Sequence, residues 1–225
     1  MNTQADGAPS LRVWDLPTRL FHWALVLLIS LQYATGEFGL LDMRWHYWFG
    51  YATLALITFR VLWGFAGSQT SRFADFLRGP AAVLRHIRAY FHKNPQSTVG
   101  HNPLGGWSVL AMLACVLLQA VSGLFASDEI TEQGPFADQV AEKTMRLMTR
   151  VHDWNQNLLL ILIALHVVAV LLHRLLKHDN LILPMLSGRK PLAAAPPLRF
   201  ISGWRALLLL AVCVAAVVAL VLFGD

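Results

Sequence analysis

Five of the nine histidines of this 225-residue chain lie within or at the ends of long apolar stretches. They are His22, His46, His152, His166 and His173. An ionisable side chain inside a membrane-length apolar segment is costly and usually has a functional reason. A neutral imidazole offers a nitrogen lone pair to a metal ion, so these side chains are the first candidates for binding a metal or a metal-containing cofactor.

The spacing of two of these histidines places them on one helix face. His152 and His166 are 14 residues apart. In an α-helix this is almost four turns, so both rings point to the same side at levels about 21 Å apart along the axis. One helix therefore offers two ligands at two depths.

The elements that carry these residues are five apolar stretches long enough to cross a bilayer, which takes about 20 helical residues. They cover residues 17–35, 45–65, 104–126, 153–176 and 206–223. Apolar residues make up 56% of the chain and charged residues 14%, which excludes a water-soluble domain and a disordered chain. The fold class that we predict is an all-α integral membrane protein.

The charges between the stretches predict the orientation, because cytoplasmic loops collect Lys and Arg. Segments 68–102 and 177–205 are basic, whereas the connections around residues 36–44 and 127–150 are acidic. The first ten residues are polar and lack a signal-peptide pattern, so we expect the N-terminus inside and the C-terminus outside a bacterial inner membrane. The basic loops suit lipid headgroups better than nucleic acid.

Two units are expected along the chain. Residues 1–190 form a transmembrane bundle, with an amphipathic helix at about 80–93 lying on the cytoplasmic interface. Residues 191–225 form a proline-rich linker and an extra transmembrane helix without any side chain able to bind a metal. We find no internal repeat and no phosphate-binding loop.

With this orientation the histidines pair by depth. His22 lies in the cytoplasmic half of the first stretch, level with His166, and His46 lies near the external surface, level with His152. Two imidazoles from facing helices are the usual axial ligands of a b-type haem, and no CxxCH motif for covalent attachment occurs. Iron with two histidine ligands has no open position, which favours electron transfer over oxygen activation.

Three further residues are candidates at these haem sites. Arg60 follows His46 by 14 residues, so it faces the inner level, where it could pair with haem propionates. His173 could do the same, although a polar role at the interface is as plausible. Gly50 would leave room for a flat ring against the backbone.

Simpler interpretations remain open for single residues. A histidine at the end of a span often only forms hydrogen bonds at the interface. Zinc is a rival for paired histidines, but it prefers four ligands, and no Cys or carboxylate stands at the inner level. Four histidines without a role are assigned to cytoplasmic segments: His86, His92, His101 and His178.

Several stretches together resemble a known family. They are VWDLPTRLFHW around His22, WHYWFGYATLALITFRVLWGFAGS from Trp45, RFADFLRGP from Arg72, GHNPLGGWSVL from Gly100, and HDWNQNLLLILIALHVVAVLLHR from His152. Over residues 11–190 the chain resembles the prokaryotic cytochrome b-561 family, in particular cytochrome b subunits of nickel–iron hydrogenases. The resemblance implies a four-helix core that holds two b haems on His22, His46, His152 and His166.

The resemblance also implies a function. Such proteins move electrons between the membrane quinone pool and an external redox partner, which is a hydrogenase, a c-type cytochrome or, in one branch, superoxide. The fifth stretch departs from the four-helix pattern, so we expect a peripheral helix and a candidate interface for a partner subunit; a homodimer stays open. Polar groups beside the outer ligands form our candidate quinone site: Asp42, Arg44, Arg150, Asp153 and Trp154.

Two alternatives to this electron carrier remain. A superoxide:quinone oxidoreductase would need a cationic path to the outer haem; the outer loops are net acidic, but Arg44 and Arg150 flank the outer ligands. A metal or proton transporter would more often show repeats or broken helices. A quinone oxidoreductase activity of the chain itself is left open.

Overall fold

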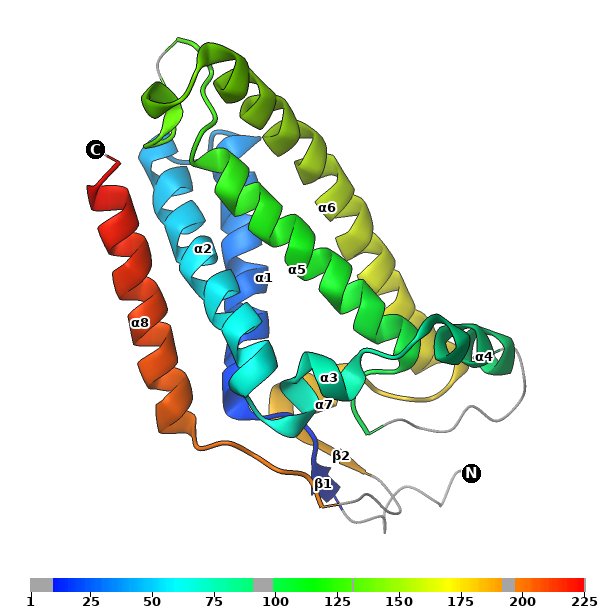
Figure 1. Ribbon diagram of the computed structural model, residues 1–225. Coiled ribbons are helices and arrows are strands. Elements are labelled where there is room, and N and C mark those ends of the chain that lie inside the picture. The colour runs from blue at the N-terminus through cyan, green and yellow to red at the C-terminus, as the bar shows by residue number, and fades with distance from the viewer. Residues whose placement is uncertain (1–9, 91–98, 131, 192–196, 225) are drawn as a thin grey trace.

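The computed structural model describes residues 10–90, 99–130, 132–191 and 197–224 (Figure 1). Five long helices dominate the chain, and the all-α fold class is confirmed. The long helices are α1 (Leu16–Gly36), α2 (Met43–Ala66), α5 (Pro103–Gly123), α6 (Glu142–Leu176) and α8 (Gly203–Leu222). The short ones are α3 (Phe73–Phe76), α4 (Pro80–Tyr90), α7 (Ile182–Ser187) and the 3₁₀ turns η1 (Gln69–Ser71) and η2 (Ala137–Gln139).

The long helices pack as two antiparallel pairs with one addition. α1 packs on α2, α5 packs on α6, and α2 also contacts α5, which joins the pairs (Figure 1). α8 packs chiefly on α2, on the side away from α6. The fifth stretch of the sequence is thus a peripheral helix beside α1, α2, α5 and α6.

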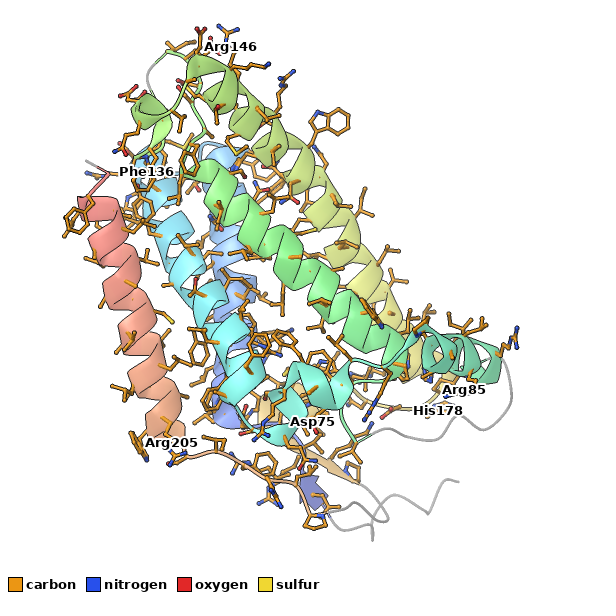
Figure 2. The ribbon with its side chains drawn as sticks, in the orientation of Figure 1. Asp75, Arg85, Phe136, Arg146, His178 and Arg205 are labelled. Carbon is orange, nitrogen blue, oxygen red and sulfur yellow. The ribbon has the colours of Figure 1, made fainter. Side chains whose placement is uncertain are left out.

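The two ends of the bundle differ. One end holds α3, α4, α7 and a two-stranded antiparallel ribbon of β1 (Ser10–Arg12) and β2 (Arg189–Pro191), and the other holds the connection from α5 to α6 (Figure 1). Figure 2 shows Arg85, His178 and Arg205 at the first end and Arg146 at the second. The first end contains the basic segments that the sequence assigns to the cytoplasm; the orientation itself stays a prediction.

Four helices of the described chain are long and apolar enough to cross a membrane: α2, α5, α6 and α8. This confirms a multi-pass membrane protein. α1 is not among them, because polar residues such as Arg19, His22 and Gln32 lower its hydropathy. Its 21 residues and its packing along α2 support the prediction that it crosses as well.

Some boundaries differ from those expected. α6 begins at Glu142, well before residue 153, and the Glu142–Arg146 ion pair, one turn apart, supports this added segment. The amphipathic helix ends at Tyr90, and residues 91–93 lie outside the described residues. The linker was expected from residue 191, but Pro191 ends β2, and 192–196 lie outside the described residues as well.

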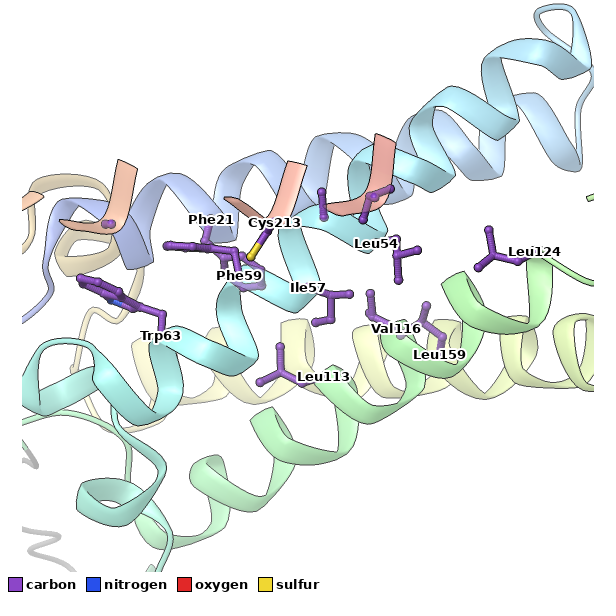
Figure 3. Close-up of a cluster of buried hydrophobic side chains, with 13 residues drawn as sticks. Phe21, Leu54, Ile57, Phe59, Trp63, Leu113, Val116, Leu124, Leu159 and Cys213 are labelled. Atoms are coloured by element: carbon purple, nitrogen blue, oxygen red, sulfur yellow. The ribbon is translucent and has the colours of Figure 1, made fainter. Parts of the chain in front are cut away.

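The buried core centres on α2. Leu54, Ile57, Phe59 and Trp63 of this helix meet Phe21 of α1, Leu113 and Val116 of α5, Leu159 of α6 and Cys213 of α8 (Figure 3). Cys213 is buried in this cluster, in line with the packing role that its apolar surroundings predict. Because α2 contacts α1, α3, α5 and α8, this packing fixes where its His46 and Arg60 lie.

A buried carboxylate holds the start of α1 to the end of α2. Asp15 is 0% exposed and caps α1 by accepting a hydrogen bond from the Thr18 amide at 2.9 Å. It also accepts one from Trp63 Nε1 at 3.1 Å. The Thr18 and Ser71 hydroxyl oxygens lie 2.6 Å apart, which adds η1 to this network.

We expect Asp15→Ala to destabilise the protein more than Asp42→Ala. Both carboxylates cap a helix, a role worth about 0.5–2 kcal/mol. The exposed Asp42 does little more, whereas loss of Asp15 also leaves the buried indole N–H of Trp63 without its acceptor, at a further cost of about 1–3 kcal/mol. Thermal unfolding in detergent measures the difference, and equal losses would show that the buried network adds nothing.

Candidate functional site

The structure brings four histidines together as two pairs. The rings of His22 on α1 and His166 on α6 have centroids 6.5 Å apart, with their planes at 52°. The rings of His46 on α2 and His152 on α6 have centroids 6.3 Å apart, with their planes at 72°. We call these the inner and the outer pair; both share α6, so they are stacked along the bundle.

Each ring of the outer pair is oriented by the helix that precedes its own. His46 Nδ1 lies 3.1 Å from the Gln32 carbonyl oxygen, and His152 Nδ1 lies 3.0 Å from that of Gln119. Because a carbonyl only accepts, Nδ1 of each ring is the donor, and Nε2 keeps its lone pair. The hydroxyls of Thr35 and Ser122 lie beside the same nitrogens, at 3.2 and 3.3 Å. Ligand histidines of metal centres are usually fixed in this way.

Two glycines give these rings their places. A Cβ atom on Gly36 would lie 2.9 Å from Cε1 of His46, and one on Gly123 would lie 2.9 Å from Cε1 of His152. Both separations are shorter than real Cβ contacts, so glycine is required for the rings to approach the helices this closely.

The orienting residues form a short repeat that the sequence analysis missed. Residues 32–36 read QYATG and residues 119–123 read QAVSG, so each half of the bundle supplies Gln, a hydroxyl and Gly at the same spacing. α1 with α2 and α5 with α6 thus build the outer site in the same way. The signal was present in the sequence as Q-x-x-[ST]-G, near the end of two apolar stretches.

The spacing of the pairs fits a metal held between them. An imidazole nitrogen binds a metal ion at about 2.0 Å, which puts the centroids of two opposed rings about 6 Å apart. Both pairs match this separation. Within the described residues, no cluster of three or more His, Cys, Asp or Glu side chains could hold a metal ion, so neither pair resembles a four-ligand zinc site.

Buried polar atoms without a partner gather near the inner pair. The described residues contain five such side-chain atoms, and three of them are His22 Nδ1, Arg60 Nη1 and His101 Nδ1. Buried polar groups are normally hydrogen-bonded, so unpartnered donors around two facing rings fit a site that binds a further polar group. The donor set of the inner site therefore suits a haem with acidic side chains.

The model of the prokaryotic cytochrome b561 family matches residues 13–188, more than three quarters of the chain. The chain belongs to this family. Membership makes it a b-type cytochrome of the membrane and implies haem b as its cofactor. The family expected from the sequence motifs is thereby confirmed.

Named relatives of this cytochrome b561 family member are less than 25% identical to it over the aligned residues. A probable Ni/Fe-hydrogenase B-type cytochrome subunit of Bradyrhizobium diazoefficiens is 23% identical, over 83% of this chain and 88% of the relative. A protein of the same name from Azotobacter chroococcum is 24% identical, over 78% and 86%. The probable Ni/Fe-hydrogenase 1 B-type cytochrome subunit of Escherichia coli is 23% identical, over 61% and 68%. No solved structure matches the chain significantly.

The other residues predicted at the haem sites of this cytochrome lie as follows. Arg60 is 2% exposed, with its guanidinium 6.0 Å from the ring of Phe21, the neighbour of His22. His173 Nδ1 lies 3.0 Å from the carbonyl oxygen of Ala169 in the same helix. The pKa of His86 is lowered by burial and then by the charge of His173, so His173 lies on the side of α6 that faces α4. A Cβ on Gly50 would meet the Gln32 side chain at an ordinary 3.5 Å.

The residues of the candidate quinone site lie in two exposed groups. Asp42 and Arg44 contact each other at 3.7 Å at the start of α2. Arg150, Asp153 and Trp154 are exposed on α6, and Trp154 is 77% exposed. No hydrogen bond or ion pair joins these two groups within the described chain, and a quinone site here stays a prediction.

Proposed function

We propose that this cytochrome holds two b-type haems and carries electrons between the quinone pool and a redox protein on the external side of a bacterial inner membrane. One observation carries the proposal: two pairs of facing imidazoles, at metal-binding separation, are stacked along one bundle. His152 and His166 stand 14 residues apart on α6, about 21 Å along the helix. The sites therefore lie at two levels of the membrane.

The residues have distinct roles in this proposal. His22 and His166 hold the inner haem, and His46 and His152 hold the outer one. Haem iron with two histidine ligands takes up and releases single electrons with little change in its ligands. Gln32 and Gln119 hold the outer imidazoles through their backbone carbonyls, which keeps Nε2 of each ring directed at the site.

The space beside the outer pair combines polar groups near the imidazoles with apolar walls. It is lined by both histidines, by Gln32, Gln119 and Gln156, and by apolar side chains of α1, α5 and α6 that include Ile29, Val116 and Leu159. Such walls suit the hydrocarbon edge of a macrocycle, and a low dielectric around the iron tunes its potential.

The partner that we propose is a nickel–iron hydrogenase, because the relatives described above carry that name. A c-type cytochrome is the alternative partner. We keep residues 191–225 as a linker and an extra transmembrane helix, and we propose that α8, which packs on α2 outside the four core helices, offers a face to a partner subunit. We keep Asp42, Arg44, Arg150, Asp153 and Trp154 as the quinone site, and the N-terminus as cytoplasmic.

The test is the absorption spectrum of the purified protein, recorded as reduced minus oxidised, with haem measured as the pyridine haemochrome. We expect a b-type spectrum, two haems for each chain, and reduction of both by a quinol. A colourless protein, or a single haem for each chain, would refute the proposal. Transport of a metal ion by haem-free protein would support the transporter alternative.

A further inference from the structure

The end of the bundle beside α3 and α7 contains a buried cation that forms no ion pair within the described part of the chain. Arg60 is 2% exposed, and its Nη1 has no hydrogen-bond acceptor among the described residues. The carboxylate of Asp15 is close enough to stabilise the Arg60 charge through space, but it is engaged by the Thr18 amide and the Trp63 indole, and no ion pair between Asp15 and Arg60 is present among the described residues. A buried guanidinium nitrogen without a direct acceptor is unfavourable, which indicates that a further anionic group belongs beside Arg60 Nη1.

A second donor lies near this cation. His101 precedes α5, and its ring is held between Trp14 and Phe76, with centroids at 4.8 and 4.7 Å. Its Nδ1 is buried without a partner. Phe76 in turn contacts Phe73 with ring centroids 5.7 Å apart, and the Arg60 guanidinium lies 5.5 Å from the Phe73 ring, so two adjacent aromatic rings connect His101 to Arg60. Burial, followed by the charges of Arg60 and His166, lowers the pKa of His101 to about 3, so the ring is neutral.

Both donors lie at the inner pair. The guanidinium of Arg60 is 6.0 Å from the ring of Phe21, the residue before His22, and 5.5 Å from that of Phe73. The charge of His166, the other member of the pair, acts on His101. Since Arg60 is almost completely buried, the anion reaches it from inside the bundle.

We propose that Arg60 and His101 together bind a propionate carboxylate of the inner haem, with Arg60 Nη1 and the His101 ring as donors. This inference rests on the proposed function, because it requires a haem between His22 and His166. A carboxylate accepts several hydrogen bonds and carries the charge that Arg60 lacks as a counterion. His101 thereby acquires a role in positioning the haem, which its place in a connecting segment does not suggest.

Four substitutions and two controls test this. His101→Phe keeps an aromatic ring between Trp14 and Phe76 but removes the donor, whereas His101→Asn keeps an N–H close to the position of Nδ1. Arg60→Met removes the charge and Arg60→Lys keeps it. His86→Phe and Arg174→Met, in α4 and the last turn of α6, are the matched controls.

Two measurements are made on the purified full-length protein: the haem content for each chain and a potentiometric titration of both haems. We expect His101→Phe and Arg60→Met to weaken retention of the inner haem by roughly 10-fold or more, as for the loss of a hydrogen bond to a charged group. The midpoint potential of the inner haem should fall in both variants, because the positive charge of Arg60 favours the reduced form. Arg60→Met removes this charge, and His101→Phe removes the second donor that holds the carboxylate beside it. The outer haem, His101→Asn and both controls should stay close to wild type.

His22→Ala identifies the signal of the inner haem. If that variant loses the inner haem while His101→Phe and Arg60→Met retain it at an unchanged potential, the propionate assignment is wrong and the two-haem proposal stands. Equal changes in both haems would indicate general destabilisation and also refute it. An effect seen only in vesicles of anionic lipid, and not in detergent, would assign the anion to a lipid phosphate instead. A wild-type protein without two haems would overturn the proposed function itself.

Discussion

Replacing His46 with alanine should leave one b-type haem for each chain in place of two, and replacing His152 should give the same protein by its spectrum. The centroids of the two rings lie 6.3 Å apart, and the outer pair contains no third histidine that could replace a lost ligand. His22→Ala and His166→Ala should remove the other haem and give a second, different spectrum. The four variants should therefore give two spectra: one shared by His46→Ala and His152→Ala, and the other shared by His22→Ala and His166→Ala.

The measurement is the pyridine haemochrome for each chain, with low-temperature difference spectra to separate the two haems. His178→Ala is the control, because this histidine is exposed and lies outside the bundle helices. The assignment of pairs would be wrong if His46→Ala and His22→Ala gave the same residual spectrum, or if any of the four variants kept both haems.

Gly36→Ala and Gly123→Ala should each weaken binding of the outer haem, by about 10–100-fold in affinity, as is usual when the support of a ligand is disturbed. A new Cβ would stand 2.9 Å from Cε1 of His46 or His152, so the ring must turn away. Turning the ring also breaks the bond from Nδ1 to Gln32 or Gln119, which sets the direction of Nε2. The inner haem should be retained.

Gly203→Ala is the control for these substitutions. It adds the same atom at the start of α8, where no atom would lie within 4 Å of the new Cβ. Haem titration of the three variants, followed by absorbance, compares them directly. If Gly203→Ala weakened the outer haem as much as the other two, close approach of the rings would not explain the need for glycine.

The sequence predicts the helices and the grouping of the histidines because the length, direction and side-chain spacing of membrane-spanning helices follow a small number of simple rules. Apolar length gives the long helices, their alternating direction gives depth, and the 14 residues from His152 to His166 give a common face. The beginning of α6 at Glu142 was missed because its first turns are charged and lack the apolar signal. The β1–β2 ribbon was missed because two three-residue strands far apart in the sequence have no pattern of their own.

The supporting residues were harder to predict. Gly36 and Gly123 look like ordinary small residues at the ends of apolar stretches, and only the rings packed on them reveal their role. His101 lies in a connecting segment, so depth arguments do not apply to it, and tertiary packing alone brings it to Arg60 and His166. Gly50 was selected for its place one turn after His46; the ring of His46 lies against α1, Gly50 lies beside Gln32, and room for a haem at Gly50 stays a prediction.

The repeated Q-x-x-[ST]-G segments show that the two halves of the core, α1 with α2 and α5 with α6, share the same residues at the outer level. At the inner level the corresponding residues of the two halves differ. Fourteen residues after its outer histidine, α6 has His166 and α2 has Arg60; fourteen residues before its glycine, α1 has His22 and α5 has Val109. At this position α6 carries a proposed haem ligand, whereas α2 carries a buried positive charge. If haems occupy both levels, as we propose, this charge stabilises an added electron at the level of Arg60, and we expect the inner haem to have the higher midpoint potential.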